Sequence, residues 1–207
     1  MSPPTDFDAR AKTWDEDTAK WVRAQRIAEA IAAGVPSPST RSVLEYGAGT
    51  GLLGLALLPL VREVTLADSS EAMLEVAREK IATRGLTNAR AVRLDLAGGA
   101  TTDLRFDLVC TLMTLHHVPD TDGILRAFRG VLRAGGVLCI SDLDAEDGSF
   151  HGAGFDGHDG FDRADLGRRM ERAGFRDVRF QTVHEVERPT PAAVRRYPLF
   201  LAIADVG

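Results

Sequence analysis

Short β-rich runs alternate with amphipathic stretches along most of the chain, and this alternation limits the fold more than any other feature of the sequence. Helices are expected at about 50–61, 70–83 and 122–132, where apolar residues recur at helical spacing. The β-rich runs around them are RSVLEYG, EVTLAD, ARAVRLD, FDLVCTL and GGVLCISDL. Strands that alternate with helices form a parallel sheet, because parallel strands need crossover connections. The pattern therefore predicts a doubly wound α/β fold with helices on both faces of the sheet.

The two ends of the chain and one internal segment depart from this alternation. An N-terminal helix is expected at about 14–33, and a last helix at 162–173. The Gly- and Asp-rich stretch at about 144–160 is too polar for a core and is predicted to be a long, lid-like loop. The final runs, FRDVRFQTVHEVE and YPLFLAIADV, suggest an antiparallel pair of strands. Because no repeat or linker divides the sequence, residues 1–207 are predicted to form a single domain.

Composition and charge narrow the classes of partner. The 207 residues include 25 basic and 30 acidic side chains, a net charge of -5, which gives no general attraction to nucleic acid or to an anionic membrane. The longest apolar stretch, 52–61, is interrupted by Gly54 and Pro59 and is too short for a membrane span. The first residues lack a signal-peptide pattern, so a cytoplasmic location is expected. Cys110 and Cys139 lie in apolar runs and are expected to be buried free thiols.

The segment VLEYGAGTGLLG leaves the first predicted strand and enters a helix. Its glycines at positions 47, 49 and 51 allow a tight turn and a close approach of the backbone to a ligand. Asp68 ends the next strand, 17 residues after Gly51, where a carboxylate can accept hydrogen bonds from the hydroxyl groups of a ribose. Together the two features predict a site for a nucleotide-like cofactor. In a purely structural interpretation, the glycines only permit the turn and Asp68 only caps the next helix.

A nicotinamide-dependent oxidoreductase is an alternative, because the glycines from Gly49 onward also satisfy the pattern G-x-G-x-x-G, with Asp68 about 20 residues further on. Three features argue against it. Glu45 would repel a pyrophosphate but attract the amino group of a cofactor that carries an amino acid. The loop has an additional glycine, Gly47, and neither tyrosine of the chain is followed four residues later by the lysine of a Tyr/Lys proton-donor pair.

These motifs occur in an order that resembles a known family. EYGAGTG, Asp68, Asp95-Leu96, FDLVCTLMTLHHV and LRAGGVLCISDL are similar to the successive motifs of the class I S-adenosylmethionine-dependent methyltransferases. Within that family, the chain is most similar to the small-molecule branch of the quinone-biosynthesis C-methyltransferases, where Leu-His-His-Val commonly follows the fourth strand. The resemblance extends from about Phe7 to the C-terminus. It implies a Rossmann-like sheet of seven strands, mostly parallel with the last strand antiparallel.

The resemblance implies S-adenosylmethionine as the cofactor and assigns the residues around its methionine and ribose groups. The backbone of Gly47, Ala48 and Gly49 would line the methionine part. Glu45 would lie near the amino group, and Asp68 would bind the ribose hydroxyls. All five residues end or follow the first two strands, at the edge where open sheets of this kind bind ligands.

The same resemblance assigns a second group of residues. Ser69 and Met73 would lie near the adenine, and the Asp95 carboxylate and the Leu96 amide would recognise the edge of the adenine ring. Thr111, at the end of the fourth strand, would lie beside the sulfonium and its methyl group. The structural alternative is that an acid after a strand, such as Asp95, only stabilises a turn.

Methyl transfer from a sulfonium is an in-line displacement, so an enzyme mainly has to align the acceptor, the methyl carbon and the sulfur. Oxygen and carbon acceptors often lose a proton, and histidine is the usual base. His116 follows the fourth strand and is the candidate catalytic residue, as a base or as a group that orients the acceptor. The alternative is a structural histidine bonded to the backbone. Because no clear catalytic residue stands out, a non-catalytic protein that binds S-adenosylmethionine is a further alternative.

A small molecule is the expected acceptor. The fourth strand lacks both the Asn/Asp-Pro-Pro-aromatic run expected for DNA amines and a Pro-Cys nucleophile for cytosine. Phe150, Phe155 and Phe161 could close over an apolar or aromatic acceptor, and Trp14 could fold over the cofactor. Packing against other side chains is the alternative for each ring. The sequence predicts no oligomeric state.

Two histidines in the lid-like segment raise the question of a metal site. His151 and His158 lie among Asp147, Asp156 and Asp159, and such side chains can ligate metals. The glycines between them indicate a flexible, solvated loop instead. An EF-hand is excluded, because Asp147 stands where that loop requires glycine. No metal ion is therefore expected.

Overall fold

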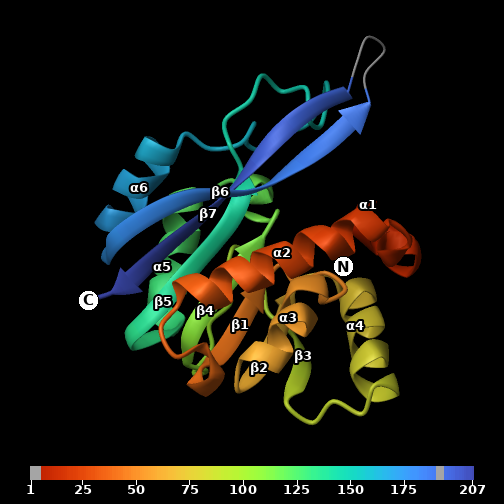
Figure 1. Cartoon of the computed structure of the whole chain (residues 1–207), viewed down its shortest axis with the longest axis vertical. Coiled ribbons are helices and arrows are strands. Elements are labelled where there is room, and N and C mark those ends of the chain that lie inside the picture. Colours follow the sequence, from red (N-terminus) through yellow and green to blue (C-terminus); the bar gives the residue numbers. More distant parts are fainter. Residues whose placement is uncertain (1–5, 190–193) are drawn as a thin grey trace.

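A seven-stranded sheet forms the centre of the computed structural model, which describes residues 6–189 and 194–207 (Figure 1). The strand order is β3-β2-β1-β4-β5-β7-β6, and β7 alone runs antiparallel to its neighbours, β5 and β6. The strands are β1 (Ser42–Tyr46), β2 (Glu63–Asp68), β3 (Ala89–Arg93), β4 (Phe106–Leu112), β5 (Leu132–Leu143), β6 (Phe175–Pro189) and β7 (Val194–Val206). The prediction of a mostly parallel sheet with the last strand antiparallel is confirmed.

Helices cover both faces of this sheet, as predicted (Figure 1). The α-helices are α1 (Asp6–Arg10), α2 (Thr18–Gly34), α3 (Leu52–Leu57), α4 (Glu71–Thr83), α5 (Thr121–Val131) and α6 (Arg163–Arg172). The 3-10 helices are η1 (Ala11–Glu16), η2 (Pro38–Thr40), η3 (Leu58–Leu60) and η4 (Leu115–His117). On one face, Ile27 of α2 and Leu57 of α3 share a core with Val64 of the sheet. On the other face, Phe128 of α5 packs in a second core with Val109.

Alternate residues of the central strands enter these two cores. In β1, Val43 lies in the core under α2 and α3, whereas Leu44 lies in the core under α5. Every residue of β1 is buried, which explains why its sequence is mostly apolar. Full burial of one such side chain contributes about 1.5–3 kcal/mol to stability. The two cores thus fix the register of the sheet and the positions of the loops at its carboxyl edge.

Capping side chains set the starts of the later helices. Ser70 accepts a hydrogen bond from the N–H of Met73 at the start of α4 (3.2 Å), and Asp162 accepts one from the N–H of Asp165 at the start of α6 (2.8 Å). These bonds satisfy backbone donors that have no partner inside the helix. Helices α4, α5 and α6 all begin within one residue of the predicted position.

The first two long helices are shorter than predicted. In the segment 14–33, the first residues belong to η1, and Asp17 caps α2 by accepting a hydrogen bond from the N–H two residues later (3.0 Å). In the segment 50–61, Gly51 has a φ of 82°, a left-handed conformation that cannot belong to a right-handed helix, so α3 begins after it. Pro59 lies in η3, which follows α3 directly. Local caps and backbone angles therefore override the apolar periodicity.

Residues 145–160, which follow β5, contain no helix or strand and form the loop expected there. Main-chain hydrogen bonds hold both ends of the loop. The N–H of Ala145 donates to the carbonyl of Phe161 (3.0 Å), and the N–H of His158 donates to the carbonyl of His116 (2.8 Å). The second bond ties the loop to η4, at the carboxyl end of β4. The role of this loop as a lid stays a prediction.

The cysteines occupy the positions that the sequence suggests. Cys110 of β4 and Cys139 of β5 are fully buried free thiols on paired strands, as predicted, and burial raises the pKa of both. Within residues 6–189 and 194–207, no helix has the length and apolar character that a membrane span requires.

Candidate active site

A cavity of about 1520 Å³ lies where β1, β2 and β4 end. From β1 the chain continues outward to β2 and β3 on one side, whereas β4 and β5 lie on the other side. Ligands of open α/β sheets bind at such a change of direction, outside the carboxyl ends of the strands. The walls of the cavity come from the glycine loop after β1, the N-terminal segment, η4, the loop 145–160 and β6.

The glycine loop turns through left-handed backbone conformations. Gly47, Gly49 and Gly51 have φ angles of 67°, 52° and 82°, which side chains other than glycine rarely adopt. At Gly47 there is also no room for a side chain, because a Cβ atom would overlap the side chain of Thr114. The loop therefore presents bare backbone to the cavity, as the sequence predicts for a ligand-binding turn.

Asp68 joins this loop to the end of β2. Its Oδ2 accepts a hydrogen bond from the N–H of Gly49 (2.7 Å), and its Oδ1 accepts one from the N–H of Ser70 (2.9 Å). Burial raises the pKa of the carboxyl group, although the backbone donors act in the opposite direction. Asp68 lines the cavity and fixes the loop at the same time.

Glu45, at the end of β1, is the most deeply buried acid that lines the cavity. Only 3% of its surface is exposed, and its Oε2 accepts a hydrogen bond from the N–H of Gly54 in α3 (2.8 Å). Burial raises its pKa from 4.5 to about 8. A cation placed beside this carboxyl group would favour its charged form.

Three of the residues predicted near the adenine line the cavity, and one does not. Ser69, Met73 and Asp95 line it, whereas Leu96 is buried outside the lining. The Oδ1 of Asp95 accepts a hydrogen bond from the N–H of Gly98 (2.8 Å), so this acid stabilises a turn whether or not it also contacts a ligand.

The N-terminal segment covers the cavity from the side of the glycine loop. Trp14 of η1 lines the cavity and lies under the Nζ atom of Lys20, which is 3.7 Å from the ring centroid. The neighbouring Asp15 accepts a hydrogen bond from the hydroxyl of Thr50 (2.6 Å) and forms an ion pair with Lys80. These contacts dock η1 onto the loop that it covers.

A buried histidine and aspartate pair stands at the opposite end of the cavity. His116 is 1% exposed, and its Nδ1 lies 2.6 Å from the Oδ1 of the fully buried Asp142. Because a carboxylate only accepts hydrogen bonds, Nδ1 carries a proton and donates a hydrogen bond to Asp142. Within the described part of the chain, Nε2 has no hydrogen-bond partner. Asp142 therefore holds the His116 ring in one orientation and leaves its Nε2 without a partner among the described residues.

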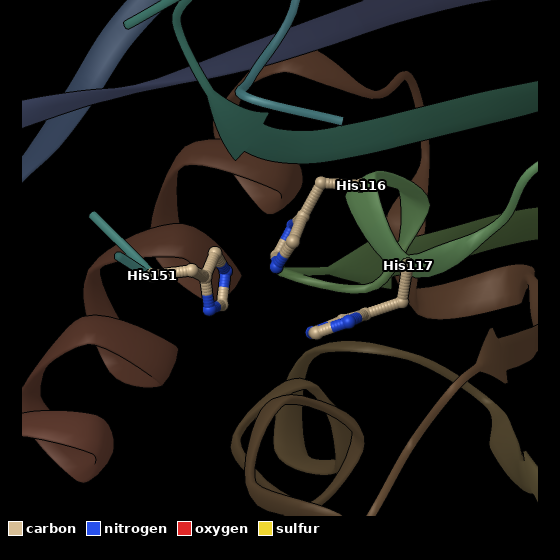
Figure 2. A group of neighbouring side chains, drawn as sticks. All are labelled: His116, His117 and His151. Carbon is tan, nitrogen blue, oxygen red and sulfur yellow. The ribbon is translucent and has the colours of Figure 1, made fainter. Parts of the chain in front are cut away.

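Two further histidines lie beside this pair, one from η4 and one from the loop 145–160. Figure 2 shows His116, His117 and His151 directed toward a common space. Desolvation, followed by the neighbouring His116, lowers the pKa of both His117 and His151 from 6.5 to about 4, so both rings are neutral at pH 7. The ring of Phe155 stacks on His151, with a centroid distance of 3.9 Å.

The histidine and phenylalanine predictions for this loop are met only in part. His158 does not approach His151; its Nε2 instead lies 3.0 Å from the carbonyl of Val118. Phe150 and Phe155 line the cavity, whereas Phe161 packs in the core under α5 and α6. The metal site at His151 and His158 that the sequence raised but did not favour has no support in the described residues, because His158 instead helps to anchor the loop.

Comparisons with known proteins identify the fold family. A family model described as a methyltransferase domain matches residues 44–138, which contain the glycine loop, Asp68 and η4. A ubiquinone/menaquinone biosynthesis C-methyltransferase from Shewanella sediminis is 35% identical over 102 residues, covering 47% of this chain and 41% of the relative. A ubiquinone biosynthesis O-methyltransferase from Xanthomonas campestris is 34% identical over 126 residues, covering 58% and 50%. Residues 44–138 are therefore similar to a methyltransferase domain, and the relatives that share this region are quinone-biosynthesis methyltransferases by name.

The solved structures agree with this similarity. The chain superposes on the structure entitled DhpI-SAM-HEP complex with a TM-score of 0.72 and 22% identity, covering 97% of this chain and 94% of the other. At this identity the likeness shows the fold. The chain spans about half the length of the curated relatives it matches or less, so the matches cover the shared domain and not the full relatives.

Several residues that line the cavity were not identified from the sequence. Thr111 is buried inside β4 and does not line the cavity. Thr114 lines it instead, and its hydroxyl donates to the carbonyl of Gly47 (3.2 Å). Met113 has a φ of 54°, which turns the chain after β4 and brings Thr114 over the glycine loop. The order of motifs predicts that the chain turns near the end of β4. It does not predict which residue adopts the left-handed conformation, because one such residue has no recognisable sequence pattern.

Two other cavity residues were missed for different reasons. Tyr46 lines the cavity at the end of β1, and its hydroxyl accepts a hydrogen bond from the N–H of Ala97 (3.1 Å). Asp142 supports His116 from the adjacent strand, although it lies 26 residues away in the chain. Tyr46 could have been found from its place next to Gly47. Asp142 could not, because its role depends on strand pairing.

Proposed function

We propose that this protein transfers the methyl group of S-adenosylmethionine to a small-molecule acceptor. The observation that carries the proposal is the glycine loop, which presents bare backbone at the point where the sheet changes direction, with Asp68 bonded to Gly49 beneath it. The match of residues 44–138 to a methyltransferase domain supports the same reaction. A dinucleotide-dependent oxidoreductase has no comparable support.

The cofactor occupies the half of the cavity nearest to β1 and β2 in this proposal. The backbone of Gly47, Ala48 and Gly49 lines the methionine part, and Glu45 lies near the amino group of the methionine. Asp68 accepts hydrogen bonds from the ribose hydroxyls. These bonds replace or add to the hydrogen bond that its carboxylate accepts from the N–H of Gly49.

Three residues serve the adenine side of the same half. Ser69 and Met73 flank the adenine, and Asp95 lies at its edge. Leu96 follows Asp95 in the motif but does not line the cavity. Its backbone amide is therefore the only group of Leu96 that we propose for contact with the adenine. Thr114 takes the place near the reacting methyl group that the sequence assigned to Thr111.

The reaction is an in-line displacement at the methyl carbon. A bond forms between the acceptor atom and that carbon while the carbon–sulfur bond breaks, and the sulfur keeps the electron pair, so S-adenosylhomocysteine leaves. An O–H or C–H acceptor also loses a proton. The Nε2 of His116 can accept this proton, because Nδ1 is already bonded to Asp142, which stabilises the positive charge that the ring gains.

The acceptor in this proposal is small and has an apolar or aromatic part. Phe150 and Phe155 line the end of the cavity beside His116, and they supply a surface for such a part. The curated relatives include enzymes of quinone biosynthesis, which agrees with this class of acceptor. The net charge of -5 favours a small molecule over a nucleic acid as the acceptor. A cytoplasmic location stays a prediction of the sequence.

Calorimetric titration tests the cofactor. S-adenosylmethionine and S-adenosylhomocysteine are expected to bind with micromolar affinity, whereas NAD and NADP are expected not to bind. The variant Asp68→Ala should bind S-adenosylmethionine at least ten times more weakly, because it loses the ribose acceptor. Asp103→Ala, which removes an exposed acid outside the cavity, is the matched control. Binding of NAD alone would overturn the proposal.

Turnover is tested separately from binding. Phenolic and quinone-like acceptors are incubated with radiolabelled S-adenosylmethionine, and methylated product is extracted and counted. His116→Ala should bind the cofactor normally but transfer the methyl group more slowly, because the variant lacks the ring nitrogen that accepts the proton of the acceptor. Equal rates for the wild type and His116→Ala would remove that role. Cofactor binding without transfer to any acceptor would favour a non-catalytic binding protein.

A further inference from the structure

Three histidines meet at the acceptor end of the cavity from two separate parts of the chain. His116 and His117 belong to η4, and His151 belongs to the loop 145–160 (Figure 2). One ring nitrogen of each lies within 4.8 Å of those of the other two. We propose that these three side chains form a binding site for a divalent transition-metal ion, with zinc as the first candidate.

The separations are close to those that a metal ion requires. A tetrahedral zinc ion with Zn–N bonds of about 2.0–2.1 Å holds its nitrogen ligands roughly 3.3 Å apart. The three nitrogens therefore have to approach from at most 4.8 Å to that distance. His151 is exposed and lies in an irregular loop, so side-chain rotation and a small shift of the loop supply the approach.

The surroundings of His116 match those of a metal ligand. Histidine ligands usually donate their second ring N–H to a carboxylate or a carbonyl, which fixes the orientation of the ring. His116 has this arrangement, because its Nδ1 bonds to the buried Asp142. Its Nε2 is buried and, within the described residues, has no hydrogen-bond partner. A buried nitrogen without a partner is unfavourable, and a metal ion would supply one.

The donor set also selects the kind of ion. Three imidazoles without a carboxylate or thiolate suit zinc, copper, nickel or iron, whereas magnesium and calcium prefer oxygen ligands. Three protein ligands leave a fourth position open, as in catalytic zinc sites. Because all three histidines line the cavity, that position is accessible from the cavity. An oxygen or nitrogen atom of an acceptor could bind there.

Binding of the ion does not depend on the proposed reaction, but it would change the role of His116 in that reaction. With the ion bound, Nε2 is a ligand and cannot accept a proton. An acceptor O–H at the fourth position would instead lose its proton to solvent, because the metal lowers its pKa. The oxygen would then attack the methyl carbon as the carbon–sulfur bond breaks and the sulfur keeps the electron pair.

Equilibrium dialysis against zinc tests the site directly. The full chain, without a polyhistidine tag, is stripped with a chelator and dialysed against zinc, and bound metal is measured by mass spectrometry. One zinc ion per chain is expected. His116→Ala, His117→Ala and His151→Ala should each weaken binding by at least tenfold, and Asp142→Asn by about 10–100-fold. His184→Ala, which removes another histidine of the cavity lining, is the matched control and should bind like the wild type.

His151→Ala keeps the test informative even if a buried variant fails to fold, because His151 is exposed. The inference is overturned if the wild type binds less than about one fifth of a zinc ion per chain, or if His151→Ala and His184→Ala bind zinc equally well. S-adenosylmethionine is titrated into the same stripped samples. Cofactor binding without zinc binding would refute the metal site alone, and zinc binding without cofactor binding would refute the proposed function alone.

Discussion

The buried carboxyl group of Glu45 should make the stability of the protein depend on pH in a specific direction. The perturbation is Glu45→Gln, which keeps an oxygen that can accept the hydrogen bond from the N–H of Gly54 but removes the titration. In the folded protein, burial raises the pKa of Glu45 from 4.5 to about 8. Between these two pH values, the folded chain retains a proton that the unfolded chain has lost.

The sign and size of the effect follow from this difference in bound protons. Because the folded state binds more protons, the contribution of Glu45 to the free energy of unfolding falls as pH rises from 4.5 to about 8. One pH unit corresponds to about 1.4 kcal/mol, so the total loss over this window is up to about 5 kcal/mol. Glu45→Gln does not titrate and should not show this loss. The amide also adds an N–H₂ donor, but that contribution is constant with pH.

Urea denaturation followed by circular dichroism, without cofactor, measures the effect at pH 5, 6, 7 and 8. The difference in unfolding free energy between Glu45→Gln and the wild type should grow by several kcal/mol in favour of the variant as pH rises. Glu75→Gln, which changes an exposed acid on α4, is the control and should give a curve parallel to that of the wild type. Parallel curves for Glu45→Gln would refute the reasoning.

Three other substitutions test the local structure around the site. Ser70→Ala removes the cap of α4 and should lower the free energy of unfolding by about 1 kcal/mol in urea denaturation. Gly47→Ala should abolish binding of S-adenosylmethionine in calorimetry, because the new methyl group overlaps Thr114 and the residue has a φ of 67°; normal binding would contradict the described turn. Phe128→Ala leaves a cavity in the core under α5 and should lower the free energy of unfolding by about 3–5 kcal/mol in urea denaturation. The molecules that remain folded should still bind the cofactor in calorimetry.

The fold was predictable because its signals are local and repeated. Apolar runs such as β1 are buried on both faces, and each is followed by an amphipathic helix, which leaves few topologies for a chain of this length. Ser70 and Asp162 mark helix starts that the sequence shows directly. The start of α2 was missed because the acids at 15–17 were interpreted as the first turn of the helix, whereas Asp17 is the residue that caps it.

The cofactor half of the site was predictable for the same reason. Gly47 and Asp68 each follow a strand directly, so the order of strands places them at one edge of the sheet. The assignment of Thr111 assumed that β4 continues without a turn. The left-handed Met113 changes the direction of the chain there, and Thr114 is the residue that reaches the glycine loop. The spacing of motifs does not predict the backbone angle of a single residue such as Met113.

The acceptor half is built differently, and this explains why the sequence could not predict it. From the sequence, His151 and His158 were considered together and both were interpreted as parts of a solvated loop. The structure uses the backbone N–H of His158 to bind the carbonyl of His116, and this bond brings His151 toward His116 instead. This main-chain bond requires glycine at position 157, where a Cβ atom would overlap the carbonyl of His116, but it does not involve the loop side chains that line the cavity. We therefore expect the loop 145–160 to tolerate changes that alter the acceptor, whereas changes to the glycine loop would disturb both the cofactor site and the packing of the sheet.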